Sequence, residues 1–400
     1  MKILIVMPRI PAPPNDGGAI YVYNITKHMA HRSHELIMAS FESNRHKQEP
    51  DLLSSYCTLY SLPAKFKPYN IPSVLKSTIT RHPVSIQHRM DIPLMGDILS
   101  QIPDNDFDII SVEGIHSGHF IDLLKKRYPG IPIILRQANV EHLLLERNAR
   151  KTTNPLIRWF LLDQARLMKK FEHDAMLSVE GVTAVTPVDR HKFLDMIPDL
   201  NCEVVEDGAD VPKLRSLERD NNTLLAISNW VWRPNIEGLK WFVKHVWPDL
   251  HKNNPDLKFE IAGHGIPEWF QDKLKNSGIT CLGFVDDIEY YRQKATVLIV
   301  PLLSGSGLKL KILEGLASGI PIITTSIGAE GIAIEPGTHY LLAETPKDFM
   351  NQTGKLLDDR NLQQKLSNNG RALIEEKYQW DKKAEVLESF MNEIITYKNS

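Results

Sequence analysis

Short apolar segments recur along the first half of the chain, and they show little alternation with polar positions. They are 2–7 (KILIVM), 34–40 (HELIMAS), 107–114 (FDIISVEG), 131–137 (IPIILRQ) and 181–186 (GVTAVT). The intervals leave room for crossover helices, and one helix is expected at 19–30. Apolar strands of this kind, linked by helices, indicate a parallel sheet that is covered on both faces.

A second series of such segments follows a polar stretch at 206–222. Its strand-like members are 223–229, 257–263, 279–284, 296–302 and 321–326, with helices expected at 236–246 and 308–317. We therefore predict an α/β protein of two doubly wound, Rossmann-like domains, each binding ligand at the carboxyl ends of its strands.

The polar stretch sets the expected domain boundaries. The first domain takes 1–205 and the second takes 206–380. A last helix at 381–400 is expected to pack back on the first domain through an apolar stripe, which consists of Ala384, Leu387, Phe390 and Ile394.

Composition narrows the class of protein. A length of 400 residues suits two domains, and 42% hydrophobic with 24% charged residues is typical of folded globular proteins. A net charge of −2 gives no support for nucleic-acid binding. Cys57, Cys202 and Cys281 lack the paired spacing of zinc or redox sites. The first apolar run resembles a strand rather than a leader, so a cytoplasmic protein is expected.

One stretch, 147–170, is basic and apolar together. It carries seven Lys and Arg residues interleaved with Leu156, Ile157, Trp159, Phe160, Leu161 and Leu162. Two interpretations stay open: a basic amphipathic helix that contacts an anionic membrane, or a surface helix whose apolar stripe faces the core.

Motifs of other enzyme classes are weak or missing. The acids of 104–108 (DNDFD) precede a strand, where a loop role is favoured over a metal site, and His28, His31 and His34 have no acid or thiol beside them. We expect no metal site. The chain also lacks GxxxxGK[ST] and GxSxG, which argues against nucleoside triphosphatases and α/β-hydrolases.

The segment 301–332, PLLSGSGLKLKILEGLASGIPIITTSIGAEGI, is apolar but contains a glycine loop, two lysines and an acid. It is expected to form a strand, the loop and a helix. Glycines let backbone N–H groups approach an anion, and Lys309 and Lys311 in the first helical turn are unfavourable unless an anion offsets them. Glu314, one turn on, can accept hydrogen bonds from vicinal hydroxyls. The pattern indicates a diphosphate beside a ribose, as in a nucleotide sugar.

This segment resembles the donor-binding signature of the retaining glycosyltransferases of family 4, also called glycosyl transferases group 1. Further similarity lies in PPNDGGAIYVYNITKHMA at the N-terminus, RQANVEHLLLER (136–147), VVEDGADV (204–211), SNWVWRPNIEGLKWFVKHVWPDL (228–250) and GFVDDIEYYRQKATVLIVPL (283–302). The second of these is similar to bacterial envelope-polysaccharide members. The resemblance implies the GT-B fold, in which two Rossmann-like domains enclose a deep interdomain cleft.

The resemblance also implies roles for individual residues. Glu314 would bind the nucleotide ribose, Lys309 and Lys311 the diphosphate, and His116 the transferred sugar, with His119 as a competitor for that last role. The donor-binding set implied is Gly17, Gly18, Phe284, Val285, Gly305, Ser306, Gly307, Lys309, Lys311 and Glu314, with His116 and Lys311 as catalytic residues. Ser306 stands where the family has its first acid, and only Arg233 and Lys240 offer a counterpart to its Arg…Lys pair.

The implied activity is a hexosyltransferase-type transfer with retained anomeric configuration, by a same-face mechanism that needs no metal or cofactor. The donor would be a nucleotide-diphosphate sugar, and the acceptor a glycan or lipid-linked molecule in envelope polysaccharide synthesis, with the enzyme cytoplasmic or peripheral at the membrane. Two alternatives stay open: a non-hydrolysing sugar-nucleotide epimerase, and a catalytically inactive nucleotide-sugar binding protein.

Overall fold

The computed structural model of the 400-residue chain describes residues 1–43, 48–65, 74, 77, 79–103, 106–217, 219–274, 277–305 and 308–399. The chain divides into two compact units. Unit 1 contains Met1–Glu206 together with Lys383–Ser400, and unit 2 contains Asp207–Lys382.

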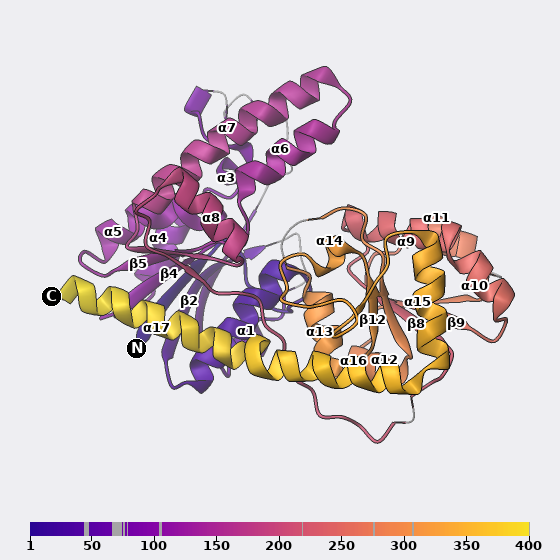
Figure 1. The fold of residues 1–400 in the computed structure, drawn as a ribbon. Coiled ribbons are helices and arrows are strands. Elements are labelled where there is room, and N and C mark those ends of the chain that lie inside the picture. Colours follow the sequence, from indigo (N-terminus) through magenta and orange to yellow (C-terminus); the bar gives the residue numbers. More distant parts are fainter. Residues whose placement is uncertain are drawn as a thin grey trace. The chain divides into compact units, whose positions relative to one another are not determined.

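Unit 1 is built on a seven-stranded parallel sheet in the order β3-β2-β1-β4-β5-β6-β7 (Figure 1). Its strands are β1 (Lys2–Met7), β2 (Glu35–Ser43), β3 (Thr58–Ala64), β4 (Ile109–Glu113), β5 (Ile133–Arg136), β6 (Gly181–Ala184) and β7 (Cys202–Val204). Its helices are α1 (Gly17–His31), η1 (Pro50–Leu53), α3 (Val84–Gln87), α4 (Ile92–Ser100), η2 (Ile115–Phe120), α5 (Ile121–Arg127), α6 (Glu141–Lys151), α7 (Pro155–Leu177) and α8 (Pro187–Met196).

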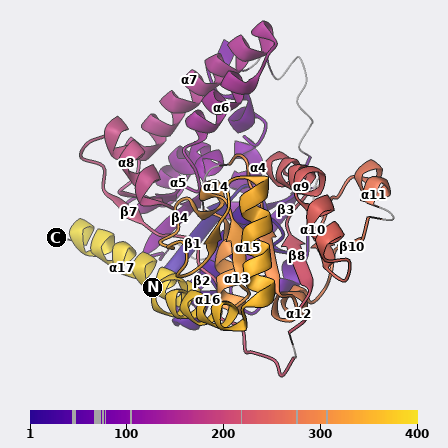
Figure 2. The same cartoon turned by 45° about the vertical axis from the view of Figure 1, so that its right-hand side comes forward.

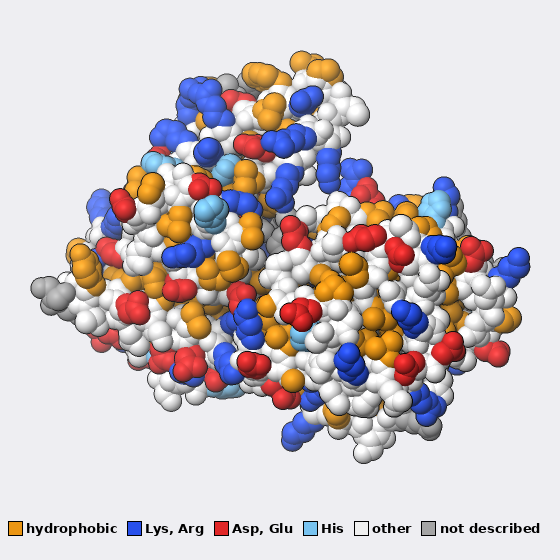
Figure 3. Space-filling view, in the orientation of Figure 1, with side chains coloured by type: hydrophobic (Ala, Val, Ile, Leu, Met, Phe, Trp, Pro, Cys, Tyr) orange, Lys and Arg blue, Asp and Glu red, His pale blue; other side chains and the backbone are white. Residues whose placement is uncertain are grey.

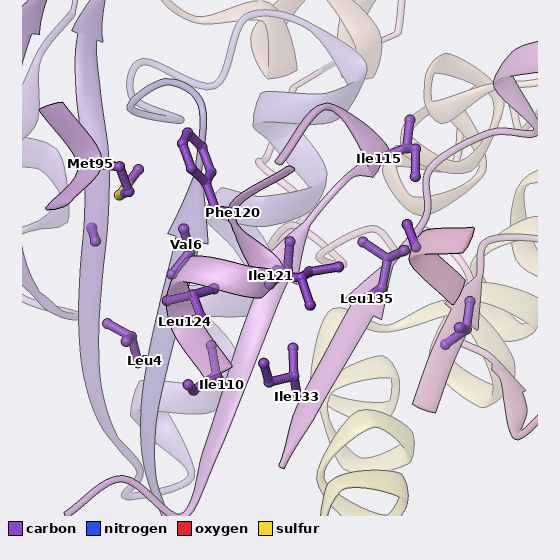
Figure 4. Close-up of a cluster of buried hydrophobic side chains, with 14 of the residues drawn as sticks. Leu4, Val6, Met95, Ile110, Ile115, Phe120, Ile121, Leu124, Ile133 and Leu135 are labelled. Carbon is purple, nitrogen blue, oxygen red and sulfur yellow. The ribbon is translucent and has the colours of Figure 1, made fainter. Parts of the chain in front are cut away.

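One face of this sheet carries the core shown in Figure 4. Leu4 and Val6 of β1 point to the same side as Ile110 of β4 and Ile133 of β5, and Phe120 closes the cluster from η2. Side chains two residues apart share a face of a strand, so the intervening residues face the other side. Both sides are buried, which explains why these strands do not alternate with polar residues.

The opposite face is covered in part by the C-terminal helix α17 (Trp380–Asn399). A Cβ atom added to Gly181 of β6 would lie 2.4 Å from Ile394 Cδ1 and 2.8 Å from the ring of Phe390. The helix therefore packs directly on the strand, and a side chain at position 181 would force Ile394 and Phe390 to move. Lys398 of α17 also donates to Glu180 at 2.8 Å.

Unit 2 is built on a six-stranded parallel sheet in the order β10-β9-β8-β11-β12-β13 (Figure 2). Its strands are β8 (Thr223–Ile227), β9 (Lys258–Ala262), β10 (Ile279–Gly283), β11 (Val297–Val300), β12 (Ile322–Thr324) and β13 (Leu341–Leu342). Its helices are α9 (Arg233–His245), α10 (Trp247–Asn253), α11 (Glu268–Leu274), α12 (Ile288–Lys294), α13 (Leu310–Ser318), α14 (Ser326–Ala329), α15 (Pro346–Asp358), α16 (Arg360–Leu373) and η3 (Ile374–Tyr378).

Two hydrophobic clusters lie on the two faces of the second sheet. Leu224 packs with residues of α9, α10 and α15, whereas its neighbour Leu225 packs with residues of α13 and η3. Helices therefore cover both faces, and the predicted α/β fold with two doubly wound sheets is confirmed.

Three strands escaped the sequence analysis: β3, β7 and β13. β3 is an edge strand of mostly half-buried residues and contains Pro63, which a central strand would not accommodate because proline lacks an N–H group. β7 and β13 are also edge strands, of three and two residues, too short for a periodic signal.

The expectation of one helix over 147–170 was wrong. Helix α6 ends at Lys151, and α7 begins at Pro155, where the side chain of Asn154 accepts hydrogen bonds from the backbone of Leu156 at 3.0 Å and Ile157 at 3.2 Å. An Asn cap followed by proline starts a helix, and a residue before proline disfavours helical geometry. α6 and α7 form an antiparallel hairpin that projects from unit 1 (Figures 1 and 2).

Candidate active site

The strand order of each sheet reverses at one position. In unit 2 this switch lies between β8 and β11, and in unit 1 between β1 and β4. Helices leave the sheet in opposite directions at such a point, so a crevice opens at the carboxyl ends of the two strands.

In unit 2, Ser228 follows β8, and the segment 301–309 follows β11 and leads into α13. The chain is closely packed here, because a Cβ atom on Gly263, which follows β9 with a φ of +120°, would lie 1.9 Å from the carbonyl oxygen of Ser228. Only glycine can occupy that position, so the β9 end helps to hold Ser228 at the switch point.

Lys311 connects the elements around this crevice. Its Nζ donates to Ser228 Oγ at 2.6 Å and to Asn235 Oδ1, in the first turn of α9, also at 2.6 Å. Burial and the nearby charge of Lys309 lower the pKa of Lys311 to about 7, with Glu314 acting in the opposite direction. An anion at this point would favour the charged form of the lysine.

Lys309 occupies the N-cap position of α13 and its side chain is buried, with Nζ 3.7 Å from a carboxylate oxygen of Glu330. Gly305 lies beside it, since a Cβ there would be 3.7 Å from Lys309 Cε. The structure therefore brings Gly305, Lys309 and Lys311 together. Ser306 and Gly307, the other loop residues of the expected donor site, lie outside the described residues.

Glu314, the expected ribose ligand, forms an ion pair with Arg292 of α12 through its Oε2. Arg292 is buried and its Nη1 also lies 3.6 Å from Glu289. Arg292 thus holds one oxygen of the carboxylate, while the Glu314 side chain stays 31% exposed. Nothing in the sequence pattern singled out Arg292.

Phe284 and Val285 follow β10, which is the edge strand of the sheet, two places from β8. The Phe284 side chain is 72% exposed, and no described contact joins it to the lysines. The two counterparts suggested for the family's Arg…Lys pair have other partners. Arg233 bonds Glu237 on the helix surface at 2.6 Å, and Lys240 lies over the ring of Trp269.

In unit 1, a cavity of about 360 Å³ lies at the switch point between β1 and β4. Its wall is formed by Met7, Pro8, Arg9, Gly18, Tyr21, Val22, Ser43, His88, Arg89, Glu113, Gly114, His116, Arg136 and Ala138. Two of the expected site residues, Gly18 and His116, thus meet in one cavity although 98 positions separate them (116 − 18).

Gly17 and Gly18 begin α1, whose N-cap Asp16 accepts from the backbone of Ala19 at 3.1 Å and from Arg9 Nη2 at 2.6 Å. Both glycines are exposed. A Cβ on Gly18 would come no closer than 3.7 Å to Asp16, so the backbone at this helix N-terminus is open to a ligand.

His116 lies in η2, directly after β4. Burial, the charge of Arg89 and the proximity of His119 lower the pKa of His116 to about 3, and burial lowers that of His119 to about 3 as well. Both imidazoles are therefore neutral at physiological pH. His116 is part of the cavity wall, so its neutral imidazole can form a hydrogen bond with a hydroxyl group of a ligand bound in the cavity. His119 is not part of that wall.

Two motifs that resembled metal sites have structural partners. Asp106 accepts from Lys2 Nζ at 2.8 Å, while Asp104 and Asn105 lie outside the described residues. The side chain of His34 is 6% exposed, and its Nε2 lies 3.1 Å from Glu388 of α17. Within the described ranges, no group of three or more His, Cys, Asp or Glu residues is arranged to hold a metal ion.

Arg136 and Glu113 are the cavity residues that the sequence analysis overlooked. They end β5 and β4 and are register partners, with Arg136 Nη1 donating to Glu113 Oε1 at 2.8 Å. The available signal was a charged residue at the end of each of two apolar strands, in VEG and LRQ.

Comparison with known proteins agrees with this geometry. Residues 221–359 match the family model of glycosyl transferases group 1. This part of the chain is similar to members of that family. An uncharacterised glycosyltransferase of Methanocaldococcus jannaschii is 30% identical over 135 residues, which are 32% of this chain and 38% of that protein. An uncharacterised protein in the cps region of Klebsiella pneumoniae is 25% identical over 174 residues, 42% of this chain and 45% of the relative. The matches thus span less than half of these relatives.

Solved structures extend the similarity in fold to nearly the whole chain. Sucrose-phosphate synthase from Thermosynechococcus elongatus superposes with a TM-score of 0.72 at 16% identity, covering 99% of this chain and 100% of its own. TarM of S. aureus gives 0.69 at 12% identity, with 98% and 99% covered. Anabaena HepE, in complex with UDP and glucose, gives 0.68 at 13% identity, with 98% and 100% covered. The fold is that of the GT-B glycosyltransferases.

Proposed function

We propose that the protein is a retaining, hexosyltransferase-type enzyme that moves a sugar from a nucleotide-diphosphate sugar to a glycan or lipid-linked acceptor. The observation that carries this proposal is the cluster of Lys309, Lys311 and Glu314 at the switch point of unit 2. Two cations suit a diphosphate, and a fixed carboxylate suits the two hydroxyls of a ribose.

Each unit has a part in the proposed reaction. Unit 2, Asp207–Lys382, binds the donor, and unit 1 offers the cavity with Gly18 and His116 to the acceptor and the transferred sugar. The comparisons support the division, since the family match falls within 221–359 and a neighbour, HepE, was solved with UDP and glucose.

The transfer needs no nucleophilic side chain. The acceptor oxygen forms a bond to the anomeric carbon, the bond from that carbon to the diphosphate oxygen breaks, and the acceptor proton passes to the leaving phosphate on the same face of the sugar. Negative charge grows on the diphosphate as the bond breaks. Lys309 and Lys311 stabilise that charge from fixed positions, which is where preorganised groups lower a barrier most. We propose that they serve in place of a metal ion and that no cofactor takes part.

The proposed setting is envelope polysaccharide synthesis at the inner face of the cytoplasmic membrane. The relative in a cps region supports the pathway class. Within the described residues, no helix combines the length and apolarity needed to span a bilayer. Contact with the membrane would instead use the tip of the α6–α7 hairpin, where Leu156 is 78% and Trp159 is 68% exposed. Figure 3 shows hydrophobic side chains at this tip with Lys and Arg beside them.

A donor screen tests the activity. The protein is incubated with UDP-, GDP-, ADP- and dTDP-sugars, with and without a lipid-linked sugar acceptor, and products are separated by mass and anomeric configuration. Transfer that retains configuration supports the proposal. Isomerisation without acceptor would identify an epimerase, and binding without turnover an inactive nucleotide-sugar binding protein. Transfer with inversion would contradict the same-face mechanism.

A further inference from the structure

The cavity of unit 1 contains a buried arginine, and two of its three nitrogen atoms have no hydrogen-bond partner among the described residues. Arg136 is 3% exposed, and its Nη1 donates to Glu113 Oε1 at 2.8 Å. Its Nε and Nη2 have no hydrogen-bond partner among the described residues. Tyr21 lies beneath the guanidinium, 4.6 Å from ring centre to Cζ, while its hydroxyl donates to the carbonyl of Val205.

The two unpaired nitrogens form one edge of the guanidinium. Nε–H and one N–H of Nη2 point the same way, in the fork that matches the two oxygens of a carboxylate or phosphate. Nη1, on the other side, is taken by Glu113. Leaving two donors of a buried cation unpaired is costly, and Arg136 belongs to the cavity wall. A bound group that accepts both hydrogen bonds would remove that cost.

Charge in the cavity favours an anion for this role. The wall contains Arg9, Arg89 and Arg136 against one carboxylate, Glu113, so its formal charge is +2 (3 − 1). Asp16 pairs with Arg9 at 2.6 Å, which leaves a local charge of +1. His116 adds no charge, because burial lowers its pKa to about 3. Glu113 Oε1 already accepts from Ser111 at 2.8 Å as well as from Arg136. The acid is therefore committed to holding the arginine in place.

We propose that this cavity is an anion subsite in which the Nε–Nη2 edge of Arg136 binds a phosphate or carboxylate group of the acceptor bidentately. The assignment of the anion to the acceptor rests on the proposed glycosyl transfer. The binding of an anion in the cavity does not depend on that proposal. The acceptor is accordingly a phosphorylated or acidic-sugar molecule, such as a sugar phosphate, a lipid-linked diphosphate or a uronic acid. Neutral glycans lack an anionic group that could accept both hydrogen bonds from Nε and Nη2 of Arg136.

Direct binding tests the subsite without knowledge of the acceptor. The full chain carrying Lys311→Met, which weakens the phosphate site of unit 2, is titrated calorimetrically with inorganic phosphate, glucuronate and glucose. Phosphate or glucuronate should bind and glucose should not. Tighter binding of phosphate would indicate that the bound group of the acceptor is a phosphate. Tighter binding of glucuronate would indicate that it is the carboxylate of an acidic sugar.

Two variants in the same background localise the binding. Arg136→Lys keeps the charge and the contact with Glu113 but removes the fork, and should weaken anion binding by about tenfold or more. Ala138→Trp blocks the cavity from an exposed wall position and leaves Arg136 intact, so it answers the question even if the first variant folds poorly. Arg190→Lys, whose arginine donates to the Cys202 carbonyl outside the cavity, is the matched control and should bind as the parent does.

The subsite is overturned if no anion binds, or if Arg136→Lys and Ala138→Trp leave anion binding unchanged. In that case the Nε–Nη2 edge of Arg136 binds water. Efficient transfer to a neutral acceptor, unaffected by Arg136→Lys, overturns the acceptor class while glycosyl transfer stands. Failure of glycosyl transfer has a different signature. It would appear as no turnover in the donor screen, with the anion titrations unaffected.

Discussion

The ammonium group of Lys311 lies 2.6 Å from the hydroxyl of Ser228, which joins the helix after β11 to the residue after β8. These two strands flank the switch point of unit 2, so the contact lies at the place where a doubly wound sheet binds its ligand. A lysine held this way has a fixed position before any ligand binds. Its ammonium group can therefore stabilise negative charge on a ligand without first having to move.

Replacing Lys311 with Met should lower turnover far more than it lowers the free energy of unfolding. The side chain keeps its length but loses the charge that the proposed reaction places beside the diphosphate. Removal of one preorganised donor costs about 3–4 kcal/mol in the barrier, about a hundred- to thousandfold in kcat. Steady-state kinetics with the donor found in the screen measures the loss. Lys244→Met, an exposed position on α9, is the control, and a normal kcat in Lys311→Met would remove the lysine from the mechanism.

The lowered pKa of Lys311 predicts a pH-dependent stability. Burial lowers this pKa to about 7, from an ordinary value of 10.5. Between these values the unfolded chain binds a proton that the folded chain does not, so the free energy of unfolding should rise with pH by about 1.4 kcal/mol per pH unit. Below pH 7 both states are protonated and this contribution is flat.

The measurement is the difference in unfolding free energy between wild type and Lys311→Met from pH 6 to 10, because other titrating groups cancel in the difference. Wild type should gain on the variant above pH 7. A difference that does not change with pH would mean that Lys311 keeps its ordinary pKa. Adding the donor should flatten the curve, since a bound diphosphate favours the charged lysine.

Glu314→Gln should raise the KM for the donor by about tenfold with a smaller effect on kcat, because a charged hydrogen-bond acceptor for the ribose becomes neutral. A 2′-deoxy donor provides the sharper measurement. If Glu314 binds the ribose hydroxyls, wild type and variant should handle the deoxy donor almost equally. Glu289→Gln is the matched control, because Glu289 also lies near Arg292, at 3.6 Å, without the expected ribose contact. An equal penalty on both donors would argue for a purely structural Arg292–Glu314 pair.

Glu172→Ala should destabilise unit 1 by about 3–5 kcal/mol, the usual cost of removing one partner from a buried charged network. Glu172 of α7 is fully buried and accepts from the backbone of Glu141 at 2.8 Å and from His142 Nδ1 at 2.6 Å, so it caps the start of α6. Chemical denaturation measures the loss. Asp174→Ala, two residues on and 54% exposed, should cost less than about 1 kcal/mol. If both variants lost the same unfolding free energy, the cap formed by Glu172 would contribute no more to stability than an exposed carboxylate.

The tip of the α6–α7 hairpin should bind anionic vesicles. Leu156→Ser with Trp159→Ser should reduce sedimentation with phosphatidylglycerol-containing vesicles by at least about tenfold, because each apolar side chain contributes roughly 1–3 kcal/mol when it leaves water. Neutralising Arg150, Lys151 and Arg158 should abolish the preference over pure phosphatidylcholine. Val188→Ser removes a 59% exposed apolar side chain from α8 and serves as control. Unchanged partitioning of the tip variants would leave the hairpin without a membrane role.

Local pattern was enough for much of this protein. Apolar strands such as β1 and β11 were visible in the sequence because both faces of a parallel sheet are buried. The glycine loop with Lys309 and Lys311 was visible because its elements are contiguous in the chain. The break between α6 and α7 could also have been predicted, since Asn154–Pro155 is a local signal for a helix start.

Tertiary structure alone decided which distant residues act together. The sequence by itself determined that Glu314 is an acid one turn into a helix; only the packing of α12 against α13 placed Arg292 on it. Likewise, Arg136 and Glu113 are ordinary strand-end residues until the register of β4 and β5 sets them side by side. The physical reason is that strand order and register depend on contacts between segments far apart in the chain, and no local periodicity encodes those contacts.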